Sequence, residues 1–297
     1  MIVVIAGIVL MLYPYISEYF FENRVDSEIM AYKECINKTV DQQYQRMLEQ
    51  AEEYNSYLQK SQMQLTDPFA NTGGTEEQPV YESLLRVDDS GIIGYVEIPT
   101  IGVKLPVYQG TSAGDLERGV GHLKGSSLPV GGKGTHAVLT GHTGLSQAKL
   151  LSDLTEMKEG DVFYIYVLGR QLAYEVYATS VVLPEDTEQL RIEKDKDLVT
   201  IVTCTPYGIN THRLFVHGKR IPFSEPQYQK ELSKTPVTLN STWRSAYGRA
   251  LLAGGMFAVC LIVLLVLDIR KIIGVMLVIV GCITFMSPEI VQEYYQI

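Results

Sequence analysis

Short runs of β-branched and other apolar residues, each ended by glycine or proline, fill the chain between residues 91 and 221. Little helical pattern separates these runs, and helices are expected only at 112–118 and 146–154. Short strands at such spacing are typical of a closed barrel or a sandwich. The sequence therefore predicts a mainly β domain. Its predicted strands are residues 92–98, 103–107, 136–140, 162–168, 172–182, 198–203 and 214–221.

The two ends of the chain are apolar enough to suggest membrane attachment. Residues 1–17 carry no charge and lack the basic start and cleavage site of a signal peptide, so we expect an uncleaved transmembrane anchor. Residues 250–267 are also uncharged and predict a second span. The next apolar stretch, 272–286, is either a shorter span that completes a hairpin or a re-entrant or interfacial helix. Together these C-terminal segments occupy residues 249–287.

Residues 18–84 contain a helical pattern that precedes the β domain. The pattern is expected to end near Gln64, because Asp67-Pro68 disfavours a helix there. After the β domain, prolines mark a linker at 224–248. The apolar residues of the helical pattern, spaced by three or four, are Tyr44, Met47, Leu48, Ala51, Tyr54 and Leu58.

The net charge and the spacing of potential ligands argue against two kinds of site, one for nucleic acid and one for a metal ion. The 297 residues include 34 acidic and 25 basic side chains, which give a formal charge of −9. A nucleic-acid-binding protein usually presents a basic face, so we expect no nucleic-acid partner. No group of His, Cys and Asp has the spacing of metal ligands, so we also expect no metal site.

Cys204 is the only cysteine within the predicted β domain. It ends the predicted strand 198–203 and stands before a turn-rich run, 205–210. A thiol at a strand end beside a polar loop is a candidate nucleophile, although a buried structural cysteine fits the same position.

Arg213 and one of five histidines are candidate partners of this thiol. If the strands on either side of the turn form a hairpin, Arg213 lies beside Cys204, where a guanidinium can stabilise a thiolate or an oxyanion. An arginine in a surface ion pair is the alternative. His142 stands between Gly141 and Gly144 in a loop that allows close approach to a substrate. The residues alone leave His142 open against the other four histidines, His122, His136, His212 and His217.

The run Thr200-Ile-Val-Thr-Cys204 resembles the active-site signature of sortases, Thr-Leu-x-Thr-Cys, with Ile201 in place of leucine. The longer runs 203–214 and 128–145 resemble the class C, pilus-assembling branch, although Thr143 stands where relatives often carry arginine. The likeness covers roughly residues 85–223. It implies a sortase-type closed β-barrel with short helices, flanked by transmembrane helices.

The resemblance also implies the chemistry. Cys204 becomes the nucleophile, His142 the general acid and base, and Arg213 the residue that positions the substrate or its oxyanion. The enzyme would cleave a Leu-Pro-x-Thr-Gly-like sorting signal of a pilin and join the acyl group to a pilin lysine through an isopeptide bond. No cofactor is needed. The partners would be pilins, with a cell-wall precursor as a further acceptor, and the catalytic domain would lie outside a bacterial membrane.

Class C sortases also resemble one another in a lid upstream of the barrel, and Asp67-Pro68-Phe69 stands in that place. We expect Asp67 to pair with Arg213 and Phe69 to cover the Cys204 sulfur. The simpler reading is that Asp67-Pro68 only ends the helix.

Three alternative functions stay open. The enzyme could anchor surface proteins to the cell wall, using a peptidoglycan-precursor amine. It could be a simple cysteine hydrolase, or an inactive module held at the membrane that has kept only the barrel.

Overall fold

The computed structural model describes residues 2–38, 41–61, 65–69, 81–143, 148–237, 248, 252–257 and 259–260. The chain divides into two compact units, which are described separately. The larger is Pro14–Trp243, and the smaller combines Met1–Tyr13 with Arg244–Ile297. Every described residue of the smaller unit is helical.

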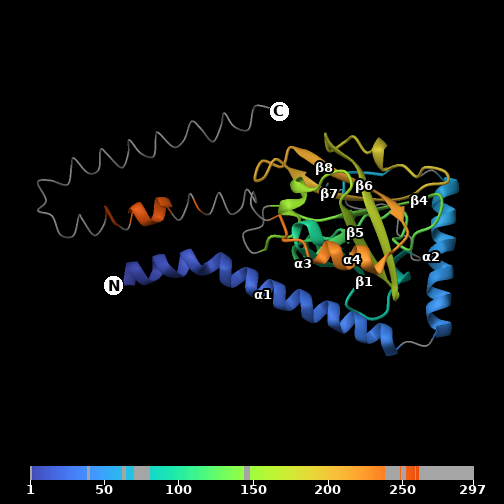
Figure 1. Cartoon of the computed structure of the whole chain (residues 1–297), viewed down its shortest axis with the longest axis horizontal. Helices are drawn as coiled ribbons and strands as arrows, with labels where there is room; N and C mark the ends of the chain where they lie inside the picture. The colour runs from blue at the N-terminus through green and yellow to red at the C-terminus, as the bar shows by residue number, and fades with distance from the viewer. Residues whose placement is uncertain are drawn as a thin grey trace, which may run out of the picture. The chain divides into compact units, whose positions relative to one another are not determined.

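The larger unit contains a closed barrel of strands in the order β1-β2-β3-β4-β7-β8-β6-β5, with β5 pairing back to β1. This confirms the mainly β fold and selects the barrel over the sandwich. The strands, labelled in Figure 1, are β1 (Ile92–Ile98), β2 (Val103–Gln109), β3 (Val120–His122), β4 (Thr135–Thr140), β5 (Val162–Val167), β6 (Arg170–Val182), β7 (Asp197–Thr205) and β8 (His212–Ile221).

The predicted strands all coincide with observed ones to within two residues, but the prediction omits β3. With three residues, β3 is too short to show an alternating pattern. The predicted helix at 112–118 is confirmed as α3 (Ala113–Arg118), which Ser112 caps by accepting a hydrogen bond from the Asp115 amide. The helix predicted at 146–154 is wrong in its described part, where a 3₁₀ helix, η3 (Ser152–Glu156), forms instead.

Two parallel pairs organise a barrel that is otherwise antiparallel. Strand β3 runs parallel to β2, and β4 runs parallel to β7, with Thr140 beside Val202. Parallel strands end at the same edge of a sheet. The loop after β4 and the last residues of β7 therefore meet at one end of the barrel.

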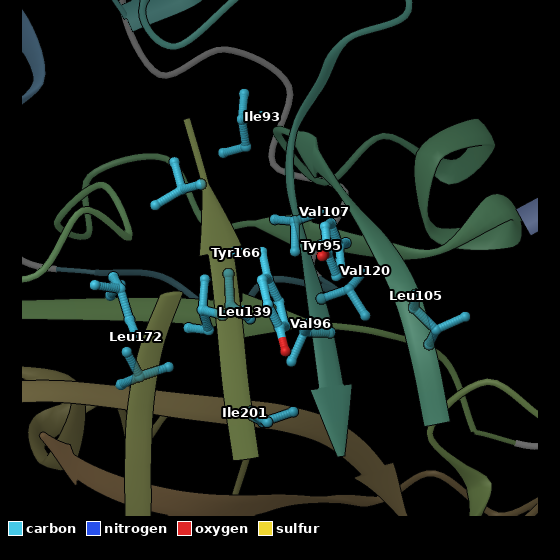
Figure 2. Close-up of a cluster of buried hydrophobic side chains, with 14 of the residues drawn as sticks. Ile93, Tyr95, Val96, Leu105, Val107, Val120, Leu139, Tyr166, Leu172 and Ile201 are labelled. Atoms are coloured by element: carbon cyan, nitrogen blue, oxygen red, sulfur yellow. The ribbon is translucent and has the colours of Figure 1, made fainter. Parts of the chain in front are cut away.

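Alternating side chains divide β7 between the barrel core and its outer face. Val199 and Ile201 belong to the inner core, whereas Val202 belongs to a separate apolar cluster. Figure 2 shows part of the larger cluster of buried side chains to which Val199 and Ile201 belong. Nearly every strand contributes to this cluster, among them β1 with Val96 and β4 with Leu139.

Two N-terminal helices pack on the barrel within the larger unit. Tyr32 of α1 (Ile2–Lys38) donates its hydroxyl to the Ile93 carbonyl and accepts from the Leu168 amide. Asn55 of α2 (Asp41–Ser61) exchanges two hydrogen bonds with the backbone of Leu128, so α2 lies along one side of the barrel (Figure 1). The predicted helix before residue 64 is thus confirmed as α2.

A short helix, α4 (Glu225–Leu232), occupies the start of the segment expected to be a linker. Its Tyr228 donates a hydrogen bond to Glu97 of β1 at 3.1 Å. The chain therefore stays attached to the barrel beyond β8.

The expected membrane segments stay predictions. Of the predicted span 1–17, residues 2–17 form the first part of α1. Residues 272–286 lie outside the described residues, and 250–267 is described only at 252–257 and 259–260. Among the helices that the structure describes, none has both the length and the apolar character needed to cross a membrane.

A chain of buried polar groups ties the outer face of the barrel to the loop between β6 and β7. His136 of β4 contacts the Arg191 carbonyl through Nδ1 at 2.8 Å and Thr200 Oγ1 through Nε2 at 2.7 Å. Thr200 Oγ1 also lies 2.8 Å from Nδ1 of His217, whose Nε2 faces Gln189 at 3.1 Å. Two residues of the β6–β7 loop (183–196) are therefore held by side chains of β4 and β8.

The Arg191 carbonyl can only accept, so His136 donates to it through Nδ1. Burial lowers the pKa of His136 and lowers the pKa of His217 to about 4.

We predict that acid destabilises the fold through His217. Its pKa is about 4 in the folded chain and about 6.5 unfolded, so the unfolded chain binds more protons between these values. The free energy of unfolding should fall by roughly 2–3 kcal/mol from this site as the pH drops from 7 to 4. Urea unfolding at pH 7.0 and 4.5 measures the loss.

The matched variant is His217→Asn, whose amide can still donate to Thr200 but does not titrate. It should be less stable at pH 7 and lose less stability on acidification than the parent. His122, whose pKa burial also lowers to about 4, titrates equally in both proteins. An equal acid loss in parent and variant would contradict the assignment.

Candidate active site

The loop after β4 is bound to the end of β7. The Gly141 amide donates to the Val202 carbonyl at 3.1 Å, and the Thr203 hydroxyl donates to the Gly141 carbonyl at 2.8 Å. His142 follows Gly141 directly, and Cys204 follows Thr203. The hydrogen bonds therefore bring the candidate imidazole and the candidate thiol to the same end of the barrel.

Cys204 and Arg213 stand opposite each other in the β7–β8 pairing, as the hairpin prediction required. Both side chains are nearly buried, with relative exposures of 9% for Cys204 and 8% for Arg213. Burial raises the pKa of the Cys204 thiol; the charge of Arg213 lowers that pKa and the charge of Asp67 raises it. Burial is the largest of these effects, so the thiol is protonated near neutral pH.

Asp67 forms a two-pronged ion pair with Arg213. Nε of Arg213 donates to Oδ1 at 2.8 Å and Nη2 donates to Oδ2 at 2.7 Å. Nη1 donates to the carbonyls of Asn210 and His212, both at 3.1 Å. The guanidinium therefore uses its donors on Asp67 and on the β7–β8 turn, and the hydrogen bond to Asp67 raises the pKa of Arg213.

Phe69 lies between the candidate imidazole and the guanidinium. Its ring centroid is 5.6 Å from that of His142, and Arg213 Cζ lies 5.0 Å from the ring centroid. The expected cover of the Cys204 sulfur by Phe69 stays a prediction, because the ring contacts of Phe69 are with His142 and Arg213.

An apolar platform beneath the lid lines the outer face of the barrel. Leu65 and Phe69 pack on it, and the Thr187 hydroxyl donates to the Leu65 carbonyl at 2.9 Å. The segment 65–69 therefore lies along the barrel with Phe69 at the Arg213 end. The platform consists of Leu123, Val138, Val182, Leu190, Val202 and Phe215.

Two of the five histidines, His142 and His212, are partly exposed at this end of the barrel, but His212 precedes Arg213 on β8 and so faces the opposite side of the sheet from Arg213 and Cys204. His122 is fully buried and hydrogen-bonded to Tyr81, while His136 and His217 belong to the network around Thr200. His212 contacts Thr211 on the turn side. Burial lowers the pKa of His142, so its imidazole is neutral near pH 7.

Thr203 is the residue of this site that the sequence reasoning missed. It occupies an inward-facing position on β7, in line with the apolar Val199 and Ile201. A polar side chain at such a position needs a buried partner, which here is the Gly141 carbonyl. A polar residue in line with Val199 and Ile201 was therefore the feature of the sequence that could have indicated a buried hydrogen bond at Thr203.

The groups assembled here suit acyl transfer at a thiol. A sulfur nucleophile, a neutral imidazole that can carry a proton and a guanidinium that can bind an oxyanion lie within one small area. Within the described part of the chain, no group of three His, Cys, Asp or Glu side chains could hold a metal ion. In the described part of the chain, neither Cys204 nor Cys35 forms a disulfide.

Comparison with known proteins gives consistent results. A family model described as "Sortase domain" matches residues 96–221. The crystal structure of sortase C1 from Streptococcus agalactiae has a TM-score of 0.62 at 41% identity, covering 67% of this chain and 100% of that one. Sortase C-1 from Actinomyces oris has a TM-score of 0.58 at 44% identity, covering 61% and 99%. Sortase D of Bacillus subtilis is 28% identical over 155 residues, which are 51% of this chain and 75% of that protein.

We predict that removing the Asp67 carboxylate activates Cys204. Asp67→Ala deletes a negative charge that raises the thiol pKa and leaves the opposing charge of Arg213 in place. The pH profile of Cys204 alkylation should move to lower pH, with a faster rate at pH 7.5 than in the parent protein. Iodoacetamide labelling of the full chain, followed by mass spectrometry of the Cys204 peptide, measures both quantities.

Asp89→Ala is the matched control, because Asp89 is a fully exposed carboxylate far along the chain from the site. The Cys35 peptide in the same samples serves as an internal reference for the reagent. An unchanged Cys204 profile in Asp67→Ala would refute the electrostatic role of the lid.

Proposed function

Because the chain belongs to the sortase family of cysteine transpeptidases, we propose that Cys204, His142 and Arg213 form its catalytic set. The pairing of Cys204 with Arg213 across β7 and β8 is the single observation that carries the assignment. The loop bonds from Gly141 to Val202 and Thr203 support the place of His142 beside them.

In the first half-reaction, Cys204 attacks the threonine carbonyl of a Leu-Pro-x-Thr-Gly-like signal. His142 takes the thiol proton, and Arg213 binds the oxygen on which negative charge develops. The Thr–Gly C–N bond breaks as His142 returns the proton to the glycine amine. The product is a thioacyl-enzyme at Cys204.

In the second half-reaction, an amine resolves this thioester. The ε-amine of a pilin lysine attacks the thioacyl carbon, His142 accepts the excess amine proton, and Cys204 leaves as the thiol. An isopeptide bond between two pilins results. The likeness to class C sortases, one of which bears the name of a pilus island of group B Streptococcus, supports a pilin as acceptor.

The segment 67–69 acts as a lid that a substrate must displace. Asp67 occupies the donors of Arg213 that the oxyanion needs, and Phe69 covers the ring of His142. A sorting signal therefore competes with the lid for the same groups, and it shifts the equilibrium only by its own affinity for the open site.

Membrane attachment through the apolar segments 1–17 and 249–287 suits this function. The substrates are secreted pilins, so the catalytic domain lies on the outer side of a bacterial membrane. The uncharged runs 1–17, 250–267 and 272–286 within these segments support the proposal.

The test is mass spectrometry of the full chain incubated with a Leu-Pro-x-Thr-Gly peptide and a pilin carrying candidate lysines. We predict a thioacyl adduct on Cys204 and a lysine-linked product, both lost in Cys204→Ala. Because lid opening precedes attack, Asp67→Ala/Phe69→Ala should form the adduct several times faster.

The acceptor decides between the related functions. An adduct resolved only by a peptidoglycan-type amine would favour cell-wall anchoring, and one resolved only by water would favour a hydrolase. No adduct in any folded variant would refute the proposed catalytic set for this signal.

A further inference from the structure

A pocket of about 680 Å³ lies beside the lid, on the side away from Arg213. Its walls come from the last turn of α2, the β3–β4 loop and the β6–β7 loop, with Leu65 at the start of the lid segment. None of the groups assigned to catalysis lines it. The pocket is therefore distinct from the catalytic set, although it adjoins the same face of the barrel.

The charge of the pocket is one-sided. Lys60, Arg191 and Lys194 line it, and no carboxylate is among its lining residues. Arg191 also reaches the exposed Glu188 at 3.1 Å, whereas Lys60 and Lys194 make no ion pair with any described residue. Such a surface attracts acidic groups.

The pocket is continuous with the platform under the lid. Leu65 and Leu190 belong both to the pocket lining and to the apolar cluster that the lid covers. A peptide that replaces the lid on the platform would displace Leu65. Its chain would then enter the pocket directly.

The length of the outer face of β7 between Cys204 and Thr200 fits the length of the sorting signal. On the outer face of β7, the row from Cys204 through Val202 to Thr200 spans about 13 Å at 3.3 Å per residue. Four extended residues, Leu-Pro-x-Thr, span a similar ~13 Å. With its threonine at Cys204, the signal ends near Thr200, where the network holds Gln189 and Arg191 of the β6–β7 loop.

From this geometry we propose that the pocket binds acidic side chains of the pilin segment immediately before the sorting signal. The apolar walls accommodate the peptide stem, and Lys60, Arg191 and Lys194 pair with its carboxylates. The pocket thus selects substrates by sequence outside the five signal residues. This inference rests on the proposed sortase function and extends it to a second part of the substrate.

The experiment compares two peptides that differ only before the signal, Glu-Glu-Leu-Pro-x-Thr-Gly and Gln-Gln-Leu-Pro-x-Thr-Gly. We use the full chain with Asp67→Ala/Phe69→Ala, so that lid opening does not limit the rate. We predict a kcat/KM three- to tenfold higher for the acidic peptide, with a lower KM and a similar kcat. Exposed ion pairs are individually weak, and the preference should shrink as salt is raised.

Charge variants of the pocket test the assignment. Lys60→Gln/Lys194→Gln should reduce the preference, because only Arg191 then remains to pair with the carboxylates, and Lys60→Glu/Lys194→Glu should invert it. Lys230→Gln on α4 removes an exposed lysine elsewhere and is the matched control, with the preference unchanged. All these residues are exposed, so the variants should unfold at the same urea concentration as the parent.

The outcomes separate this inference from the proposed function. Equal kcat/KM values for both peptides, with a thioacyl adduct formed from each, would overturn the pocket and leave the sortase chemistry intact. A preference for the acidic peptide that persists in Lys60→Glu/Lys194→Glu would also overturn it. An adduct from neither peptide would refute the proposed function itself.

Discussion

The parallel pairing of β4 with β7 is the constraint on which the site depends. Because both strands end at the same edge of the sheet, the loop that follows β4 begins beside Cys204. Thr203 and Val202 then hold Gly141 from two directions, so His142 emerges next to the thiol. The antiparallel β7–β8 hairpin brings Arg213 to the other side of Cys204. Strand order, more than any one side chain, assembles the three groups.

The outer face of β7 changes character along its length. Cys204 lies at the reactive end, Val202 belongs to the apolar platform, and Thr200 is part of a fully hydrogen-bonded polar network. The partners on β8 follow the same order, since Arg213, Phe215 and His217 face these residues in turn. A peptide lying on this face would contact the Cys204–Arg213 pair first, then the apolar platform, and then the β6–β7 loop that the polar network holds. The outer face of β7 and β8 thus presents these three kinds of side chain as successive rows of one sheet.

The sequence predicted the parts of this structure that depend on local pattern. Alternating apolar runs predicted most strands, and the β7–β8 hairpin followed from the turn between them, which placed Arg213 opposite Cys204. Strand β3 was missed because three residues carry no period. The barrel's strand order could not be derived, because it depends on which distant strands close the barrel. The sequence showed Thr200 only as part of the signature. In the structure its hydroxyl is hydrogen-bonded to two imidazoles from other strands, those of His136 on β4 and His217 on β8.

The Asp67–Arg213 ion pair compensates a guanidinium charge that is nearly buried. The two side chains keep only 11% and 10% of their exposure, and a buried guanidinium without a partner is costly, on the order of 3–5 kcal/mol. Simple release of the lid would impose that cost. A substrate carbonyl oxygen that takes the place of Asp67 would give the guanidinium a new acceptor, and negative charge would develop on that oxygen only when Cys204 attacks. Under the proposed function, displacement of Asp67 by a bound substrate therefore costs less than opening of the site without one.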